Sequence, residues 1–385
     1  MSEQRRFECT IMRGGSSKAV FFKKDRLPDD AVLRDRIILA AFGSPDVRQI
    51  DGLGGSDITT SKVAIIGPPT KEDADIDYLF GQVQINAPEV IWNTNCGNIS
   101  AAVGPFAIDE GLVEAQEPYT ILRINNLSTD KTIIARVPVK GGKAVVQGDY
   151  EIPGVPGSGA KIELDYKECI GAATGRLLPT GNVSDILDVP GIGRVEVSIV
   201  DIANSVCFVK AEDIGVNGYM SPPEIRGDKE LQNKLEAIRN EAAKAMGLIS
   251  EGDVALEKSP IQPLISFVSQ ANDYIDYGTG KTIKGEDMDF AARILFNQMP
   301  TDSFPITATI CISVASQIKG TVVNSIMNEN QVGRGAVNFG HARGINHVEV
   351  VVNENNGNIT VEKALVGRTA RRLMDGNVYV RPDVF

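Results

Sequence analysis

Two long apolar runs stand out in a chain whose hydrophobic residues otherwise occur in short, strand-like segments. The run ISAAVGPFAI at 99–108 is apolar on every side of a helix, so we expect a helix that is buried all round and begins at Asn95 to Asn98. The run ITATICISVASQI at 306–318 is rich in β-branched residues, and helix and strand both stay open there. The pattern predicts strands that enclose at least one central helix.

The order of the predicted elements repeats along the chain. The segment CTIMRGGSSKAVFFKKDRLP at 9–28 predicts strand, glycine turn and strand, and EVSIVDIANSVCFVKAEDIG at 196–215 has the same layout, with Ser17 aligned to Ser205. A helical stretch ending in glycine follows each of them, at 29–43 and at 228–247. We therefore expect two similar α+β halves, 1–184 and 185–385. We expect closing strands over 361–382, which could return to the first half. The Gly/Pro-rich segment 151–161 is typical of a surface loop.

Composition and charge narrow the class of protein. The chain has 385 residues, of which 42% are hydrophobic and 23% charged, as in ordinary globular proteins. The formal net charge of −11 argues against nucleic acid or an anionic membrane as a partner, because both require a basic surface, whereas a small anionic substrate needs only local donors. No segment has the length of a membrane span or the apolar core of a signal peptide.

Cysteine and histidine usage gives further expectations. Five widely spaced cysteines without a CxxC pair indicate free thiols in a reducing cytoplasm. The two histidines, His341 and His347, lie in no metal-site pattern, so we expect no metal. The sequence does not fix the oligomeric state, and a homo-oligomer is compatible with it.

Cys96 is the cysteine placed best for chemistry. It lies in the polar turn NTNCGN, directly before the expected buried helix. The free N–H groups and the dipole at a helix N-terminus stabilise a thiolate, whose pKa can then fall below its usual 8.5 or so. Gly97 allows the backbone to approach a ligand, and Asn95 and Asn98 supply amide donors. The alternative is a small buried hydrophobe, which is how we interpret Cys9, Cys169 and Cys207.

A glycine-serine turn and a lysine are further candidates. In MRGGSSK at 12–18, the residues Gly14, Gly15, Ser16 and Ser17 can form a nest of backbone N–H groups that binds an anion, or simply a tight hairpin turn. Lys62 opens the apolar strand VAIIG, where desolvation lowers the pKa of a lysine and makes it a usable base. The alternative for Lys62 is a side chain that snorkels from a strand end.

The segment NFGHARG at 338–344 has the pattern of a second anion site. It is bounded by glycines, and His341 and Arg343 are suitable partners for a carboxylate. As an isolated pattern it is equally compatible with a plain turn.

Taken together, these motifs resemble the family of 2-methylaconitate cis-trans isomerases. The segments that carry the resemblance are MRGGSSK, DGLGGSDITTSKVAIIG, NTNCGNISAAVGPFAIDEG, GAATGRLLPTGN and NFGHARG. The family also includes 3-methylitaconate Δ-isomerase, 4-oxalomesaconate tautomerase and aconitate Δ-isomerase. The likeness covers nearly the whole chain, and through FGSPDVRQIDGLGG at 42–55 it is strongest to methylitaconate Δ-isomerases.

The resemblance implies a diaminopimelate-epimerase-like fold and a proton-transfer reaction. In that fold, two similar halves each wrap a curved sheet or barrel around a central helix, and the active site lies in the cleft between them. The family uses no cofactor and acts on small unsaturated di- and tricarboxylates. Its catalytic lysine and cysteine fall on Lys62 and Cys96, its substrate-contacting serine on Ser17, and its Gly-His pair on Gly340 and His341.

The expected reaction removes a proton next to a carboxylate and returns one two carbons away, so that the C=C bond moves. Lys62 and Cys96 would share the acid and base roles.

Two alternative functions stay open. One is a two-thiol racemase or epimerase that uses Cys96 and Cys311, because Cys311 lies at roughly the repeat position of Cys96. The other is a carboxylate-binding protein without catalysis.

Two features depart from the family pattern. The segment Pro300 to Pro305 stands where relatives tend to have a histidine before a Gly/Thr-rich stretch, and it replaces a carboxylate-binding turn. Arg343 stands where relatives more often carry a small residue. Both changes affect the substrate that we expect and leave Lys62 and Cys96 in place.

Overall fold

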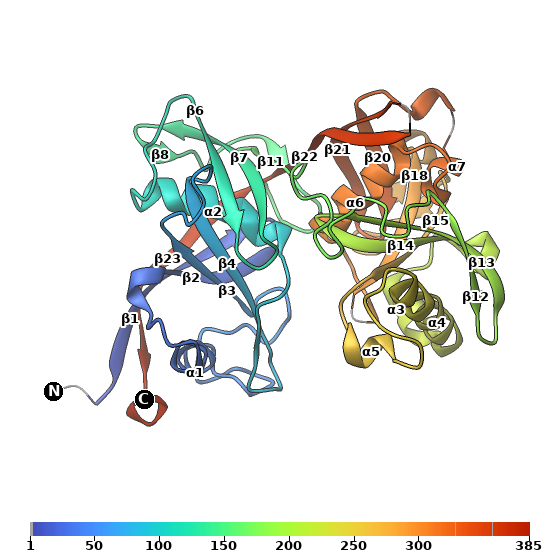
Figure 1. The fold of residues 1–385 in the computed structure, drawn as a ribbon. Helices are drawn as coiled ribbons and strands as arrows, with labels where there is room; N and C mark the ends of the chain where they lie inside the picture. Colours follow the sequence, from blue (N-terminus) through green and yellow to red (C-terminus); the bar gives the residue numbers. More distant parts are fainter. Residues whose placement is uncertain (1–2, 297, 328, 356) are drawn as a thin grey trace. The chain divides into compact units, whose positions relative to one another are not determined.

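The chain forms two compact units in the computed structural model, which describes residues 3–296, 298–327, 329–355 and 357–385 (Figure 1). Unit 1 comprises Met1–Leu164 and Gly367–Phe385, and unit 2 comprises Asp165–Val366. The boundary expected at residue 185 falls inside unit 2, at the start of β12 (Asp185–Val189). The last strand, β23 (Ala370–Val380), belongs to unit 1.

Unit 1 is a set of strands around one central helix. Its elements up to that helix are β1 (Arg5–Gly14), β2 (Ser17–Lys23), η1 (Lys24–Arg26), α1 (Ala31–Phe42), β3 (Lys62–Gly67), β4 (Ile76–Val83), β5 (Val90–Ile91) and α2 (Gly97–Asp109). They are followed by β6 (Tyr119–Asn126), β7 (Lys131–Lys140), β8 (Lys143–Ala144), β9 (Tyr150–Glu151), β10 (Ser158–Gly159), β11 (Ile162–Asp165), β23 and η5 (Pro382–Val384).

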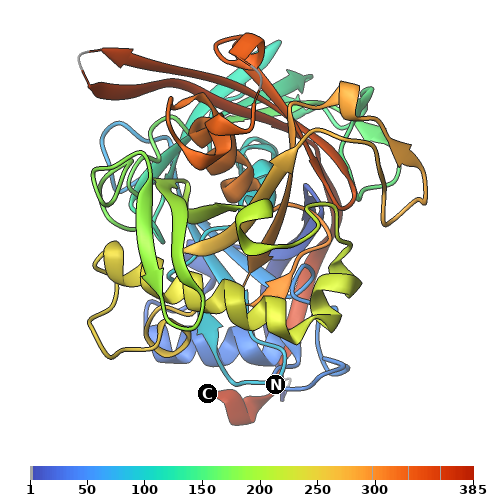
Figure 2. The ribbon, with the colours of Figure 1, turned by 90° about the vertical axis from the view of Figure 1, so that its right-hand side faces the viewer.

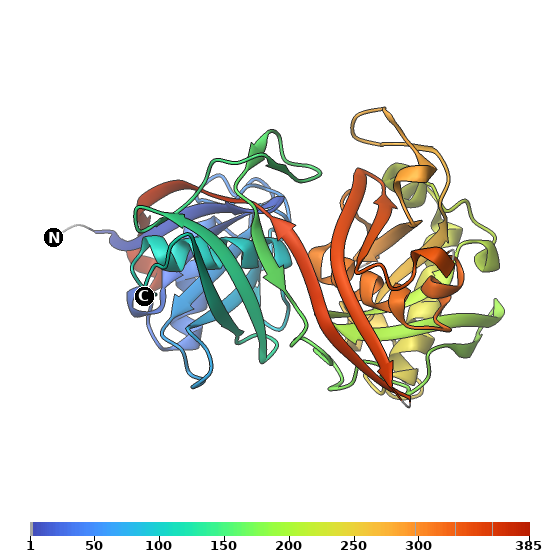
Figure 3. The same cartoon turned by 90° about the horizontal axis from the view of Figure 1, so that it is seen from above.

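Unit 2 has helices on two sides of its strands (Figure 2). Its first elements after β12 are β13 (Gly193–Ile202), β14 (Asn204–Lys210), η2 (Glu212–Ile214), α3 (Pro222–Gly227), α4 (Lys229–Ala245), α5 (Ala255–Lys258), β15 (Leu264–Gln270), β16 (Tyr274–Ile275) and β17 (Thr282–Ile283). The remaining ones are η3 (Gly285–Asp287), β18 (Phe290–Phe296), β19 (Met299–Pro300), α6 (Ile306–Gln317), α7 (Val322–Ser325), η4 (Glu329–Gln331), β20 (Ala336–His341), β21 (Gly344–Asn355) and β22 (Asn358–Arg368). Figure 3 shows β21 and β22 as a long antiparallel pair.

The two units repeat the same sequence of strand pairings. In unit 1, β1–β2 is antiparallel, β2–β3 parallel, β3–β4 antiparallel, β4–β6 parallel and β6–β7 antiparallel. In unit 2, β13–β14, β14–β15, β15–β18, β18–β20 and β20–β21 alternate in the same way. In each unit, a buried helix also lies in the chain between the two strands of the last parallel pair. This helix is α2, between β4 and β6, in unit 1 and α6, between β18 and β20, in unit 2. The prediction of two similar α+β halves is confirmed.

The helix expected at 99–108 is α2, and it is buried on every side as predicted. Every residue from Ile99 to Ile108 is buried, and strands β1, β2, β3, β6 and β7 surround the helix (Figure 1). Gly104 allows close packing, because a Cβ there would lie 2.7 Å from a methyl carbon of Val137 on β7. An apolar helix without a polar face is stable in this position because it exposes almost no surface to water.

The second apolar run also forms a helix, α6, although its β-branched residues left the choice open. Its residues from Ile306 to Ser316 are all buried, and the helix packs against β13, β14 and β21. Tertiary burial therefore outweighs a helix propensity that β-branched residues lower by only a few tenths of a kcal/mol each.

The two glycine-terminated helices are confirmed as α1 and α4. Gly43 ends α1 in the left-handed conformation, with φ of 71°, and Gly247 follows α4 with φ of 73°. Unlike α6, α4 is amphipathic: Leu231, Leu235 and Ile238 pack into a core with β13, β14 and β15, and the opposite side of the helix faces outward (Figure 2).

Within the part of the chain that is described, no helix is both long and apolar enough to cross a bilayer. The five cysteines all carry free thiols.

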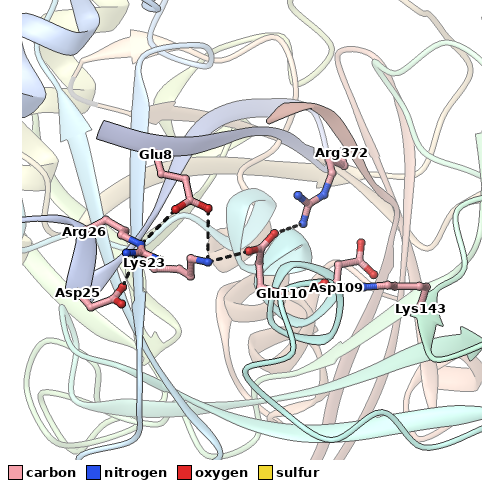
Figure 4. A network of polar contacts seen from close by, with 8 residues as sticks. All are labelled: Glu8, Lys23, Asp25, Arg26, Asp109, Glu110, Lys143 and Arg372. Carbon is pink, nitrogen blue, oxygen red and sulfur yellow. Dashed lines mark hydrogen bonds and ion pairs between the residues drawn. The ribbon is translucent and has the colours of Figure 1, made fainter. Parts of the chain in front are cut away.

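A network of charged side chains surrounds the C-terminal end of α2 (Figure 4). The carboxylate of Glu110 lies 3.0 Å from Nζ of Lys23 and 2.8 Å from the Arg372 guanidinium, and Lys23 also lies 3.6 Å from Glu8. Partial burial raises the pKa of Glu110, but the hydrogen bonds from Arg372 and Lys23 outweigh it, so the pKa is lowered overall. The ionised Glu110 thus ties α2 to β2 and β23.

We expect Glu110→Gln to destabilise the protein in a pH-dependent way. A carboxylate whose pKa is lowered by folding stabilises the protein above its unfolded pKa of about 4.3, and this contribution is lost as the pH falls below that value. The variant should lose about 1 kcal/mol of unfolding free energy at pH 7 and much less near pH 3.5, as measured by urea denaturation. Asp25→Asn is the matched control, since the Asp25 side chain is 71% exposed and lies 3.8 Å from Arg26. An equal loss for Glu110→Gln at both pH values would contradict this role for its charge.

Candidate active site

The glycine-serine turn and the start of α2 are in direct contact. A Cβ on Gly14 would lie 2.5 Å from the backbone oxygen of Asn98, and one on Gly15 would lie 2.1 Å from its Oδ1. Gly15 also has φ of +51°, which favours glycine. The Asn98 amide donates to Ser16 Oγ at 3.1 Å and accepts from Ser16 N–H at 3.4 Å. The structure thus brings together two of the motifs that the sequence analysis singled out.

Cys96 is the N-cap residue of α2. Its backbone is extended, with φ of −127°, and its carbonyl accepts hydrogen bonds from the N–H and the hydroxyl of Ser100 at 3.0 and 3.1 Å. Its half-buried side chain makes no capping hydrogen bond. Gly97 is the first residue of the 13-residue helix, so its backbone N–H is among the free donors that favour an anion at this end. The neighbouring Asn95 has its Oδ1 buried without a hydrogen-bond partner among the described residues.

Lys62 is the first residue of β3 and is only 8% exposed. Its Nζ donates to Gln82 Oε1 at 2.6 Å and lies 5.3 Å from the centre of the Phe80 ring. It forms no ion pair with a carboxylate within the described parts of the chain. Lys62 is therefore a buried amine with a neutral hydrogen-bond acceptor and an aromatic neighbour.

Lys62 lies on the side of the sheet that faces α2. Ala19 of β2 is directly opposite Lys62, so the two side chains share a face. Phe21, two residues after Ala19 on that face, packs against Phe106 of α2 with ring centroids 5.2 Å apart. The buried Ser17 comes two residues before Ala19 and begins β2. The starts of β2, β3 and α2 consequently lie at one end of unit 1, where a lysine, a cysteine, a serine and free backbone N–H groups gather.

The candidate residues of unit 2 lie in the β20–β21 hairpin. His341 ends β20, is 2% exposed and accepts a hydrogen bond at Nδ1 from the backbone N–H of Arg343 at 3.3 Å. The hydroxyl of Tyr274 donates to the His341 carbonyl at 2.7 Å, and a Cβ on Gly340 would lie 2.8 Å from that hydroxyl. Burial raises the pKa of Tyr274 well above its ordinary value, so it remains a donor and holds the turn in place.

The two departures from the family pattern contact each other in unit 2. Nη1 of Arg343 lies 3.8 Å from a carboxylate oxygen of Asp302, within the segment Pro300 to Pro305. The guanidinium also lies directly on Gly278, where an added Cβ would be 2.0 Å from Nε. The Arg343 side chain is 32% exposed, and the long ion pair leaves its donors available to an anion.

Cys311 does not occupy the position equivalent to Cys96, and that part of the sequence interpretation was wrong. Cys96 precedes α2, and the residue that precedes α6 is Pro305. Cys311 lies in the middle of α6, is fully buried and has its Sγ 3.2 Å from the Val200 carbonyl. Burial raises the pKa of its thiol well above the ordinary value. The two apolar runs are similar, and matching them placed Cys311 opposite Cys96. The repeat matches the two helices, however, and not the two cysteines.

Sequence reasoning missed two residues that contact the candidates, Gln82 and Asp302. Gln82 lies directly opposite Lys62 in the antiparallel pair β3–β4. Alternation in the segment 76–83 could have placed Gln82 on one face, but the register with β3 is set by the loop between the strands, which the sequence pattern does not determine.

The contact between Gly15 and Asn98 can be tested by a pair of glycine substitutions. Gly15→Ala introduces both a strained positive φ and an overlap with Asn98, whereas Gly141→Ala, with φ of +63° and no atom within 4 Å of the added Cβ, introduces the strain alone. We expect Gly141→Ala to cost about 1 kcal/mol of unfolding free energy and Gly15→Ala ~2 kcal/mol more, measured by chemical denaturation. Equal losses would mean that the turn is not held against α2.

Comparison with known proteins agrees with this architecture. The family described as "PrpF protein" matches residues 4–381. The chain is 48% identical to "3-methylitaconate isomerase" of Eubacterium barkeri, covering 99% of this chain and 98% of that protein. It is 38% identical to "2-methyl-aconitate isomerase" of Shewanella oneidensis, covering 98% and 97%.

A solved structure, "Crystal Structure of Methylitaconate-delta-isomerase", superposes with a TM-score of 0.88 at 47% identity, covering 100% of this chain and 97% of that one. The fold implied by the motifs, the diaminopimelate-epimerase-like arrangement of two similar halves, is confirmed. The chain belongs to the PrpF family.

Proposed function

We propose that this member of the PrpF family is a cofactor-independent isomerase that moves a C=C bond in a small unsaturated di- or tricarboxylate, with methylitaconate as the preferred substrate. The observation that carries this proposal is the full-length similarity to a 3-methylitaconate isomerase, in a chain that has Lys62 and Cys96 at one end of unit 1. Methylaconitate, aconitate and oxalomesaconate are the other candidate substrates.

Lys62 and Cys96 are the proposed acid-base pair. Their placement supports this: both belong to the end of unit 1 where β2, β3 and α2 begin, and Lys62 is on the face toward α2. Each can hold and release one proton.

The proposed reaction is redox-neutral and needs no second substrate. The base takes the proton from the carbon between a carboxylate and the C=C bond, and the electron pair spreads over the carboxylate and the allylic carbons. The acid then donates a proton to the far alkene carbon, which completes the shift. Since such carbon acids are weak, negative charge that develops on the carboxylate oxygens must be stabilised by preorganised donors.

Backbone and side-chain donors near the pair suit that task. In unit 1, the Gly15 and Ser16 N–H groups already donate to the Thr369 carbonyl and to Asn98. We therefore propose that the turn Gly14–Ser17, through its serine hydroxyls, and the helix start Gly97–Asn98 bind one carboxylate, and that Asn95 orients the substrate. The contact of Asn98 with Ser16 supports a single binding surface, because it fixes the turn on the helix start. In unit 2, we propose that Gly340, His341 and Arg343 bind carboxylate oxygens.

The two-thiol alternative has no support in the position of Cys311. A thiol that is fully buried in the middle of α6 cannot reach the carbon of a substrate without local unfolding. The non-catalytic alternative remains an outcome of the following experiment.

We expect methylitaconate in D₂O to incorporate deuterium and to shift its C=C bond when the protein is added. Proton NMR on a panel of methylitaconate, cis- and trans-aconitate, 2-methylaconitate and oxalomesaconate reports both the reaction and the substrate. The absence of exchange in every acid of the panel would mean that the protein only binds carboxylates.

Variants in the same assay test the roles of the residues. Lys62→Ala and Cys96→Ser should each lower kcat at least ~100-fold, because each removes a proton-transfer group. Cys311→Ala should keep most of the turnover of the folded protein. If a Cys311 variant were inactive while Lys62→Ala remained active, the allylic isomerase mechanism would be wrong.

Arg343→Gln should raise KM about 10-fold with a smaller change in kcat, because a charge-assisted hydrogen bond to a substrate carboxylate is lost. Steady-state kinetics with the substrate found in the panel measure both constants. Asp302→Asn is the control: it removes the competing carboxylate 3.8 Å from Arg343 and should not raise KM. Equal KM for wild type and Arg343→Gln would remove Arg343 from the substrate site.

A further inference from the structure

The hydrogen bond between Lys62 and Gln82 is built into the sheet. The two residues are directly opposite each other in the antiparallel pair β3–β4, so their side chains leave the same face. Nζ of Lys62 donates to Oε1 of Gln82 at 2.6 Å, and both residues are 8% exposed. A contact made by opposite residues of paired strands needs little reorganisation, so the position of Nζ follows from the register of β3 on β4.

The orientation of the Gln82 amide is fixed by its nitrogen. Nε2 donates to the backbone carbonyl of Ser61 at 2.9 Å and to that of Ile58 at 3.2 Å. These two acceptors use both N–H groups of the amide. A flipped amide would place its oxygen against two carbonyls, so Oε1 faces Lys62.

A second glutamine holds the loop that supplies those carbonyls. The side chain of Gln49, 1% exposed, donates to Ser61 Oγ at 2.6 Å and accepts from the Ser56 N–H at 2.8 Å. Gly54 packs against the Gln49 amide, since a Cβ there would lie 2.2 Å from its carbon. The loop from Gln49 to Ser61 therefore presents a fixed pair of carbonyls to Gln82.

The surroundings of Lys62 are neutral on every strand that flanks it. On β4 it meets Gln82 and the ring of Phe80, and on β2 it is opposite Ala19. The adjacent Lys18 leaves the other face of the sheet. In the preceding loop, the Asp57 carboxylate accepts from the N–H and the hydroxyl of Thr59 at 2.8 and 2.6 Å. At the start of α2, which lies at the same end of unit 1 as the start of β3, the titratable residue is Cys96.

We propose that Gln82 is the positioning residue of Lys62: its oxygen fixes Nζ while it adds no charge, so the amine can both lose and regain a proton. This inference rests on the proposed role of Lys62 in proton transfer and assigns a determinant of that role. An amide oxygen accepts from both an ammonium and a neutral amine; it favours the ammonium through a charge-assisted hydrogen bond but adds no net charge. A carboxylate in its place would hold the proton on Lys62 by Coulomb attraction.

The geometry also orients the lone pair of the neutral amine. When Lys62 has lost a proton, one of its two remaining N–H groups still donates to Oε1 of Gln82 at the observed contact. The lone pair must then point away from Gln82. Gln82 thus keeps the lone pair off its own side and leaves it the two other staggered positions around Nζ for taking a substrate proton.

Two substitutions at Gln82 separate its charge from its geometry. Gln82→Glu keeps the acceptor and adds a negative charge, so the limb of the pH–rate profile that is due to Lys62 should move up by one to two pH units. Gln82→Met keeps the approximate volume and removes the acceptor, so kcat should fall about 10- to 100-fold with KM nearly unchanged. The matched control is Gln84→Glu, which places the same charge two residues further along the chain.

An NMR titration of the Lys62 side chain, labelled at Cε, gives a readout that does not depend on turnover. Its midpoint should rise in Gln82→Glu and change little in Gln84→Glu, and this measurement also serves if wild-type protein shows no isomerisation, in which case only the proposed function fails. The inference is overturned if active wild-type protein and a folded Gln82→Met variant share the same kcat and pH profile. It is also overturned if Gln82→Glu leaves the Lys62 titration where it was.

Discussion

The burial of α2 on all sides is the constraint on which the rest of unit 1 depends. A helix without a polar face has only one stable environment, the interior, and strands must therefore surround it. The same packing fixes where its first residue lies, because Gly14 and Gly15 allow the β1–β2 turn to close on Asn98. Cys96 owes its position to this contact, and Glu110 holds the opposite end of the helix through Lys23 and Arg372.

The chemistry of the site follows from how polar groups are satisfied around that helix. Cys96 caps α2 with its backbone, and its carbonyl accepts a hydrogen bond from the Ser100 hydroxyl. Its side chain takes no part in the cap. Lys62 is buried beside a neutral amide and an aromatic ring instead of a carboxylate. A buried amine in such surroundings is suited to proton transfer, which a tight ion pair would oppose.

The repeat of the fold does not extend to the chemistry. Units 1 and 2 share their order of strand pairings, yet the residue before the buried helix is Cys96 in one and Pro305 in the other. Unit 2 instead places His341 and Arg343 in a hairpin turn, where the Tyr274 hydroxyl donates to the His341 carbonyl. The same architecture therefore presents proton-transfer candidates in unit 1 and candidate carboxylate-binding groups in unit 2.

The sequence by itself determined the buried helix at 99–108, the repeat of α+β elements, the glycine-terminated helices and the motifs that carry Lys62, Cys96 and His341. These follow from local periodicity and from residues that act on their immediate neighbours. Only the tertiary structure decided that the run at 306–318 is a helix, that Cys311 lies inside it, and that Gln82 is the partner of Lys62. Strand register and the packing of one run against another depend on residues far apart in the chain, and no local pattern encodes them.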